Sequence, residues 1–507
     1  MTEIYRNHPT VLLDTAFSLG VALLFMYLVT GDGMIEMMAF YTAVFVIGMV
    51  YSFAVWRRTW VSFEDTEIVV LRDTWVTKKT KRIQYSRLAS VGVAKSIINR
   101  ICGTTKLIFN VNSSINANVS EATLTVDSEL AERIRCELNS RIFSKESETA
   151  EEPEMETLVK VSNADIIIHA FISQPTSRLV FAVLMLVYSF VSILYDSAGG
   201  LVIPLLLLAA NEIIPLAKEI LTYSNYRLYR VGDTITVESG LLSTIRMSFK
   251  IGKVNSVRMR QPLLARALGM SVLEAEVVGI AVAGDDASTP LLCPLKKDAE
   301  VRELMARIMP EVVFEPESIS QSRGAFMAMV ITNLLYICLA IGATAFFVAF
   351  VHPMIGETDG IDNALILVTE VFVAIGIPLL LVGHIIMAQR NRRFAMGSES
   401  FLLVYGGYDT MSEFILYDKV QYTSVDSGPI QRLFGNATLH VSMMSSRGFR
   451  EIVSGLFPPR DLEHVPAEVM GRIFDGRYDH RRYERPTRKI GLYQHSSYRP
   501  DLRVPIT

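Results

Sequence analysis

The sequence predicts an α+β membrane protein with six transmembrane helices in three hairpins. Each hairpin is expected to precede a small cytoplasmic β-barrel or sheet that ends in one helix. Three observations lead to this prediction: an internal repeat, paired apolar runs, and short β-rich runs after each pair. The repeat comes first, because it decides how many units have to be explained.

The repeat is clearest in an Arg-x-x-Gly ending that occurs three times. Residues 83–103 read IQYSRLASVGVAKSIINRICG, and steps of 166 residues lead to FKIGKVNSVRMRQPLLARALG and ILYDKVQYTSVDSGPIQRLFG. Repetition at equal offsets indicates one domain type used three times. The repeated residues are Arg100, Gly103, Arg266, Gly269, Arg432 and Gly435.

The composition indicates a membrane protein. Half of the residues are hydrophobic, 20% are charged and the mean hydropathy is +0.32, which is too apolar for an ordinary soluble chain of 507 residues. Runs of about 20 apolar residues match the roughly 30 Å hydrocarbon core of a bilayer. We therefore expect six transmembrane helices. The runs occur near residues 11–30, 37–56, 179–195, 200–221, 325–351 and 363–388.

Charged residues predict the orientation of these helices. The segments that join the paired runs contain no Lys or Arg, whereas WRR at 56–58, YSNYRLYR at 223–230 and RNRR at 390–393 follow the second run of each pair. By the positive-inside rule the joining segments face outward, and the repeats and both termini face the cytoplasm. The expected location is the cell membrane, with several passes. Asp14 and the lack of a cleavage pattern argue against a signal peptide in the first run.

The repeats read as small β-rich domains. In the second copy TITVESGLLSTIRMSFKI predicts two strands around Ser239-Gly240, and Gly406-Gly407 marks the corresponding turn of the third copy. A helical pattern ends each copy, namely SELAERIRCELNSRIF, LKKDAEVRELMARIM and PRDLEHVPAEVMGRIF.

These features resemble a known family. A membrane hairpin, a basic aromatic entry such as WRRTW, a strand-Gly-strand hairpin and the Arg-x-x-Gly turn are similar to the bacterial pleckstrin-homology-like (PH-like, bPH2) membrane-flanked domain. Three such units in one chain resemble the YdbT-like membrane proteins of bacteria and archaea. The resemblance implies a PH-like fold, a membrane location, and recognition of protein or lipid. The copies differ, since Thr74 replaces Gly240 and Gly406, so we do not expect all three to bind the same ligand.

The connecting segments are polar. SKESETAEEPEMET at 144–157 has no apolar periodicity and is predicted to be a flexible linker. The expected hairpins cover 1–58, 178–222 and 325–390, and the PH-like domains cover 59–145, 223–312 and 391–476. The remaining segments are an acidic linker with a pre-membrane segment at 146–177, a linker at 313–324 and a basic tail at 477–507.

The basic tail predicts contact with anionic lipids, because each basic residue near such a surface contributes about 1 kcal/mol. The competing interpretation is a solvated tail that binds nothing. The residues expected to contact the membrane are Arg477, Arg481, Arg482, Arg485, Arg488 and Lys489.

Two sets of residues have both a structural and a functional interpretation. Glu370 and Glu212 lie within apolar runs, where carboxylates are costly. They either pair within the helix bundle or line an ion or substrate path. The repeated Arg and Gly residues either complete a short helical turn, with glycine at positive φ, or contact a headgroup or peptide.

No catalytic pattern is evident. The sequence contains no GxGxxG after a strand, no phosphate-binding GxxxxGK loop, no GxSxG and no HExxH, and its eight histidines have no metal-ligand spacing. We therefore expect no enzyme, no cofactor, no metal site and no nucleic acid partner.

The predicted function is a binding or scaffold module at the membrane. Its expected partners are the lipid bilayer, anionic lipids, another membrane protein or a second copy of the chain. The alternative is a transporter or channel-like protein with regulatory PH-like domains. The lack of broken spans in corresponding halves argues against transport.

Overall fold

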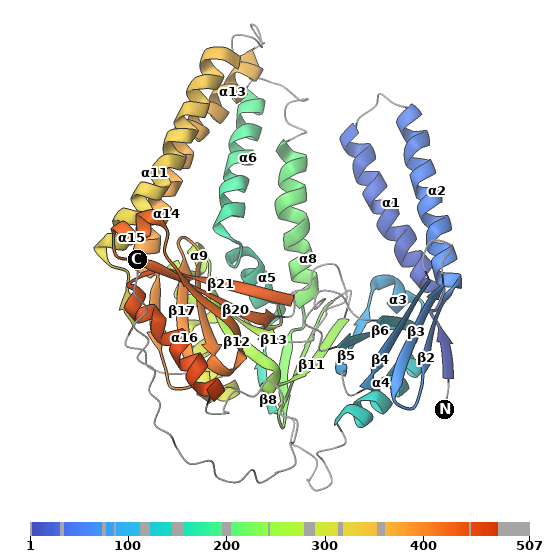
Figure 1. Cartoon of the computed structure of the whole chain (residues 1–507). Helices are drawn as coiled ribbons and strands as arrows, with labels where there is room; N and C mark the ends of the chain where they lie inside the picture. Colours follow the sequence, from blue (N-terminus) through green and yellow to red (C-terminus); the bar gives the residue numbers. More distant parts are fainter. Residues whose placement is uncertain are drawn as a thin grey trace, which may run out of the picture.

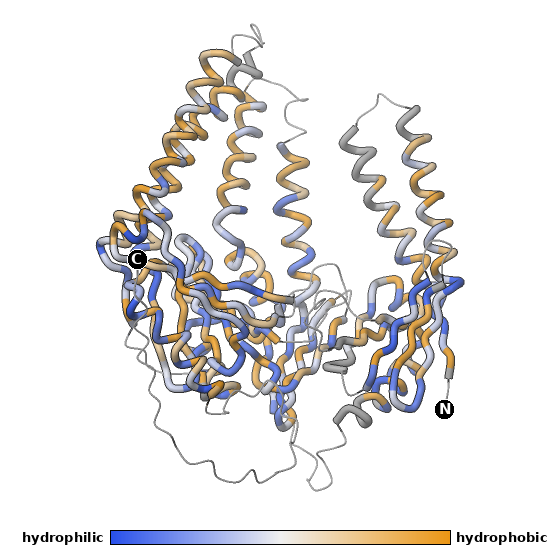
Figure 2. Tube along the Cα trace, in the orientation of Figure 1, coloured by the Kyte–Doolittle hydropathy of each residue, from blue (hydrophilic) through white to orange (hydrophobic). Residues whose placement is uncertain are grey.

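The computed structural model describes residues 3–30, 35–73, 78–85, 88–111, 122–143, 156–194, 204–241, 244–277, 289–312, 318–351, 360–445 and 448–474. Three small domains form a row, and the long helices extend from one side of it (Figure 1). Hydrophobic residues predominate in these helices, whereas the domains show mixed hydropathy (Figure 2).

Each domain combines a four-stranded part, a three-stranded part and a C-terminal helix. Domain 1 contains β1 (Glu3–Arg6), β2 (Thr59–Phe63), β3 (Glu67–Asp73), β4 (Lys78–Gln84), β5 (Leu88–Lys95), β6 (Thr104–Val111), β7 (Ala122–Asp127) and α4 (Ser128–Phe143). Domain 2 contains β8 (Glu156–Lys160), β9 (Arg227–Val231), β10 (Thr234–Ser239), β11 (Thr244–Lys250), β12 (Val254–Gln261), β13 (Met270–Val277), β14 (Leu291–Lys297) and α10 (Asp298–Ile308). Domain 3 contains β15 (Ile319–Ser320), β16 (Arg393–Met396), β17 (Ser400–Gly406), β18 (Thr410–Leu416), β19 (Val420–Asp426), β20 (Ala437–Ser445), β21 (Gly448–Phe457) and α16 (Pro459–Phe474).

Strands of neighbouring domains share sheets. The three-stranded part of domain 1 continues into the four-stranded part of domain 2, in the order β7-β6-β5-β11-β10-β9-β8. The same arrangement joins domains 2 and 3, in the order β14-β13-β12-β18-β17-β16-β15. The two outermost parts are the sheets β1-β2-β3-β4 and β19-β20-β21. The domains are therefore joined through main-chain hydrogen bonds.

Alternating side chains explain the strands. Leu439, Val441 and Met443 of β20 are buried, whereas His440 and Ser442 between them are partly exposed. The predicted hairpin glycines adopt positive φ values, +118° at Gly240 and +96° at Gly406, which L-residues rarely adopt. The closing helices bury one apolar side, as the spacing predicted. In α10 the buried residues are Val301, Leu304, Met305 and Ile308.

The segment before each hairpin belongs to the following domain. Strands β1, β8 and β15 pair with the first strand after each hairpin. Thus 1–58 is more than a hairpin, and residues 156–172 form β8 and α5 (Asn163–Ile172) where the sequence indicated a linker and pre-membrane segment. These strands are too short for a clear periodic pattern, and their pairing partners lie beyond the hairpin.

The apolar helices follow the expected runs. They are α1 (Thr10–Thr30), α2 (Ile35–Arg57), α6 (Thr176–Leu194), α8 (Ile214–Tyr223), α11 (Arg323–Phe346), α13 (Gly360–Val371) and α14 (Ile377–Asn391). Wider π-helical turns occur at Ala209–Ile213, Phe347–Val351 and Phe372–Gly376. Pro215 follows the first of these turns and Pro378 the third. Proline has no N–H for the helix ladder, so a local widening is expected there.

The expectation of six spans requires correction. Within the described residues, four helices are long and apolar enough to cross a membrane: Ala39–Arg57, Thr176–Leu194, Arg323–Phe350 and Ile366–Asn391. The first expected run contributes the shorter apolar helix Thr10–Gly20. The fourth expected run, 200–221, begins outside the described residues and contains Glu212, Lys218 and Glu219, which lower its hydropathy.

Candidate functional site

The repeated Arg-x-x-Gly sequence forms the same short turn in all three domains. The turns are α3 (Ile97–Ile101), α9 (Leu263–Ala267) and α15 (Pro429–Leu433). Gly103, Gly269 and Gly435 follow them with φ of +70°, +65° and +66°. A Cβ built on any of the three would meet no atom within 4 Å. The backbone conformation, and not a lack of space, therefore favours glycine here.

The repeated arginines of domains 1 and 2 contact the next domain along the chain. Arg100 donates a hydrogen bond to the carbonyl of Leu241, in the β10–β11 turn. Arg266 donates to the carbonyl of Gly407 at 3.3 Å and to Thr410 Oγ1 at 2.6 Å, in the β17–β18 turn. Leu241 and Gly407 are 166 residues apart, so both arginines bind the equivalent turn. From the sequence, these arginines were expected to act within their own domain or to contact a ligand.

The described residues contain no domain after the third for Arg432 to contact. Arg432 is exposed at the end of α15. Its neighbour Leu433 is 77% exposed, and Ile101, at the equivalent position of α3, is 81% exposed. These turns thus present an apolar side chain next to an arginine.

The short turns lie at the base of the apolar helices. Ser96, the N-cap of α3, donates to Asp14 Oδ1 of α1 at 3.0 Å. Arg266 of α9 also lies 3.6 Å from the Met387 sulfur of α14. A Cβ at Gly324 of α11 would lie only 2.8 Å from the carbonyl oxygen of Phe434, which follows α15. Each turn therefore positions a domain against a hairpin.

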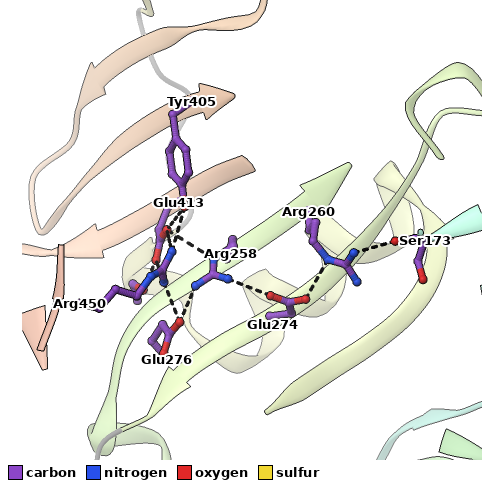
Figure 3. A network of polar contacts seen from close by, with 9 residues as sticks. Ser173, Arg258, Arg260, Glu274, Glu276, Tyr405, Glu413 and Arg450 are labelled. Carbon is purple, nitrogen blue, oxygen red and sulfur yellow. Dashed lines mark hydrogen bonds and ion pairs between the residues drawn. The ribbon is translucent and has the colours of Figure 1, made fainter. Parts of the chain in front are cut away.

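A buried network of ion pairs fills the junction between domains 2 and 3 (Figure 3). Arg258 of β12 pairs with Glu274 of β13 at 3.1 Å, with Glu276, and with Glu413 of β18 at 3.4 Å. Arg260 extends the network to Glu274 at 3.0 Å. Arg260 also donates to the carbonyl of Ser173 at 2.7 Å, just after α5. Glu413 is 0% exposed, so its charge depends on these partners.

Arg450 of β21 completes the network from domain 3. It pairs with Glu276 at 2.6 Å and with Glu413 at 2.8 Å, and it donates to the Tyr405 hydroxyl at 2.9 Å. Tyr405 in turn donates to Glu413 Oε2 at 2.8 Å. The three arginines balance the three glutamates, so the network is neutral as a whole. One arginine from each domain binds carboxylates of both, which fixes the relative position of the two domains.

Burial and charge determine the protonation of this network. Burial raises the pKa of Glu413, while the charge of Arg258 and hydrogen bonds from Tyr405 and Ser256 act in the opposite direction. Burial and the Glu413 charge raise the pKa of Tyr405 well above its usual range. Burial lowers the pKa of Arg258, but the nearby carboxylates raise it more. Tyr405 thus remains a neutral hydrogen-bond donor and Arg258 remains charged.

The junction between domains 1 and 2 contains a cavity in place of such a network. The cavity has a volume of about 320 Å³. Its charged lining residues are Lys95, Arg100, Arg135, Arg246, Glu132 and Glu238. Four basic groups against two acidic ones favour an anionic group. No cluster of His, Cys, Asp or Glu within the described residues could hold a metal ion.

The other predicted site residues do not come together. Glu212 lies in the π-helical turn before α8 and accepts a hydrogen bond from Asn211 at 2.9 Å. Glu370 is half-buried near the end of α13. The six basic residues of the tail lie outside the described residues.

The junction residues were missed by the sequence analysis, although a signal was present. VRMRQ in β12 and EAE in β13 place charges at alternate positions of strands that also carry buried apolar residues. Such strands have a polar side and an apolar side, and a buried polar side requires a charged partner. The partner strand in another domain was not evident from local sequence.

Comparison with family models identifies the repeated unit. A family model described as Bacterial PH domain matches residues 15–142, 176–309 and 340–470, which is more than half of the chain. Each match covers one copy of the 166-residue repeat. Comparison with curated proteins and with solved structures gave no match.

Proposed function

Because the chain belongs to the bacterial PH domain family, we propose that it is an integral membrane protein whose three PH-like domains form one cytoplasmic platform. The platform would bind protein or lipid partners at the membrane surface, without catalysis. One observation carries this proposal: the apolar helices extend from the same side of the row of domains (Figure 1).

The short turns support contact between this platform and the bilayer. Ile101 and Leu433 are exposed beside Arg100 and Arg432, at the base of the apolar helices. An apolar side chain next to a basic one suits the boundary between hydrocarbon and headgroups. The basic tail at 477–507 would add electrostatic attraction to anionic lipids.

The joined sheets support a scaffold more than three independent binding modules. Main-chain hydrogen bonds cross both junctions, and the neutral ion-pair network closes the second one. Partners bound to different domains would therefore be held at fixed spacing. The basic cavity beside Arg100 is the candidate site for an anionic group of a partner.

A transporter or channel-like protein with regulatory PH-like domains is the second candidate. The π-helical turns before α8 and α14 favour it, since such turns are frequent at functional sites. Pro215 and Pro378 also account for these turns without any transport role. We therefore prefer the scaffold.

Quenching by brominated lipids tests the platform. Ile101→Cys and Leu433→Cys would each carry a fluorescent dye, in vesicles, in a full-length chain without the four native cysteines. Phe474→Cys is the control, because Phe474 is 83% exposed at the end of α16, which packs against β19 and β20. We expect quenching at the first two positions and none at the third. Equal quenching at all three, or quenching at none, would contradict the platform.

Solute flux separates the two candidates. Vesicles with the purified chain are expected to leak ions and small solutes no faster than empty vesicles. A protein-dependent flux that Glu370→Gln abolishes would favour the transporter.

A further inference from the structure

The two junctions between domains use the same backbone register. At the first junction Thr244 of β11 lies opposite Lys95 of β5. At the second, Thr410 of β18 lies opposite Gln261 of β12. Both residues of the second pair are 166 positions after those of the first. The pairing is therefore a repeated property of the domain, and one domain's three-stranded part binds the next domain's four-stranded part in a fixed way.

In the two end domains, no strand among the described residues pairs with these same edges. Strand β4 of domain 1 is equivalent to β11 and β18, since its bounds differ from theirs by 166 and 332. Strand β19 of domain 3 is likewise equivalent to β5 and β12. No described strand pairs with the outer edge of β4 or of β19. The two ends of the described row thus present the two complementary halves of one junction.

The side chains of β4 and β19 are more exposed than those of the equivalent strands within the junctions. All residues of β4 except Ile83 are exposed. In the equivalent β11 one residue is buried and the other six are partly buried, and in β18 five of the seven residues are buried. Tyr422 of β19 is 62% exposed, whereas its equivalent Ser256 in β12 is fully buried by the junction. An exposed strand edge is a template for pairing with another chain.

The outer edges of β4 and β19 also have complementary chemistry. Strand β4 has the sequence KKTKRIQ, with four basic residues and no acid, and β19 has the sequence VQYTSVD, with one acid and no base. The shared register would place Lys79 opposite Asp426 and Ile83 opposite Tyr422. Opposite charges on facing positions stabilise strand pairs, and so do apolar pairs. Asp426 accepts a hydrogen bond from Ser424 at 3.0 Å and lies 3.8 Å from His440 Nε2, and its side chain is two-thirds exposed.

We propose that the β19 edge of one chain binds the β4 edge of a second copy, in the register of the two internal junctions. This inference deepens the scaffold function, on which it rests, by naming a second copy as the partner. Domains 1 and 3 lie at opposite ends of the row, with domain 2 between them (Figure 1). Each copy has one edge of each kind, so the interface is head-to-tail and generates rows or closed rings.

The orientation of the helices fits this assembly. Both internal junctions keep the apolar helices on one side of the row (Figure 1). Repetition of the same pairing would keep the helices of the second copy on that side as well. Several copies could thus share one membrane plane.

Disulfide formation between two different chains tests the interface. Full-length chains without the four native cysteines would carry either Lys79→Cys or Asp426→Cys, with different tags, and would be mixed in detergent and reconstituted into vesicles. Directly opposite residues of antiparallel strands have Cα atoms about 5 Å apart, within the range of a disulfide. We expect a mixed dimer on oxidation, and dimers of neither variant alone.

The register has its own control. Tyr422→Cys would lie about 13 Å along the strand from the position opposite Lys79, too far for a disulfide. Dimers with Tyr422→Cys as abundant as those with Asp426→Cys would overturn the proposed register. The absence of any mixed dimer would overturn the interface. The lysines of β4 would then serve to prevent the edge strand from pairing with other chains. A chain with both Lys79→Cys and Asp426→Cys gives a further test. A disulfide within the monomer would also overturn the interface between copies, because β4 and β19 of the same chain would then lie side by side.

A charge exchange tests the interface with the native cysteines in place. Lys79→Glu should raise the dissociation constant of self-association about fivefold, and Lys79→Glu with Asp426→Lys should restore it. Lys160→Glu, on the exposed strand β8, is the matched control and should leave it unchanged. Equal effects of Lys79→Glu and Lys160→Glu would contradict the proposal. The cross-linking result does not depend on whether Leu433 contacts the bilayer. The interface between copies and the platform at the membrane are therefore tested separately.

Discussion

Three residue pairs join β5 to β11 at the first junction, whereas six join β12 to β18 at the second. Gly92 occupies the position of Arg258 in the first junction, and Met247 that of Glu413. The first junction therefore lacks the ion-pair network and contains a basic cavity. The second also gains Asp409, whose carboxylate accepts hydrogen bonds from the backbone N–H and the hydroxyl of Thr176 at 3.0 Å and 2.5 Å. One backbone geometry thus supports a fixed junction and a more open one.

Among these variants, removal of the Glu413 side chain at the second junction should cause the largest loss of stability. Glu413→Ala leaves Arg258 and Arg450 without their shared carboxylate in a buried site, so we expect a loss of about 3–5 kcal/mol in the free energy of unfolding. Glu451→Ala is the control, because Glu451 is exposed on β21 and pairs with His440 at 2.7 Å. It should cost less than about 1 kcal/mol. Denaturant unfolding in detergent would measure both variants, and similar losses would contradict a special role for the network.

The repeated arginines offer a second comparison. Arg266→Ala removes the hydrogen bonds to Gly407 and Thr410, and we expect a loss of about 1–2 kcal/mol. Arg432→Ala, at the equivalent exposed position, should change the stability of the dilute monomer by less than about 0.5 kcal/mol. Unfolding measured under the same conditions would test this. Equal losses would show that the arginine acts within its own domain.

A buried histidine beside the second junction predicts a dependence on pH. Burial, with a smaller effect of Arg260, lowers the pKa of His169 to about 3. The unfolded chain, with a pKa near 6.5, therefore binds the proton that the folded chain excludes. The contribution of His169 to the free energy of unfolding is complete above about pH 6.5. It declines as the pH falls towards 3, by up to about 1.4 kcal/mol per pH unit. His169→Gln should flatten the pH profile of the free energy of unfolding between about pH 6 and 4. An unchanged profile for His169→Gln would contradict this assignment.

Substitution of a turn glycine should cause the smallest loss of stability among these variants. Gly435→Ala places an L-residue at φ +66°, which costs about 1 kcal/mol. Gly428→Ala is the matched control seven residues earlier, since Gly428 has φ −72° and a Cβ there would meet Gln431 at 3.9 Å, an ordinary van der Waals contact. Thermal unfolding of the two variants should therefore differ. Indistinguishable melting would remove the argument that conformation selects glycine here.

Part of this account could be predicted from the sequence. The repeat period led to three domains of one fold, and the Ser239-Gly240 and Arg-x-x-Gly sequences led to turns with positive φ, because these signals are local. The junctions could not be predicted, because strand pairing between domains joins residues such as Arg258 and Glu413, which are far apart in the chain. The role of Arg266 was missed for the same reason, since its partners belong to the next domain. Strands β8 and β15 were missed because they are short and their partners lie beyond a hairpin.

If the three PH-like domains form one platform, they do not move independently. Spin labels at Arg133 of domain 1 and Phe474 of domain 3, both exposed, would report the distance between these domains in vesicles. We expect one narrow distance distribution, similar in width to that of a pair within domain 3 such as Tyr422 and Phe474. A distribution much broader than that of the control pair would contradict it, because the domains would then move independently despite the shared sheets.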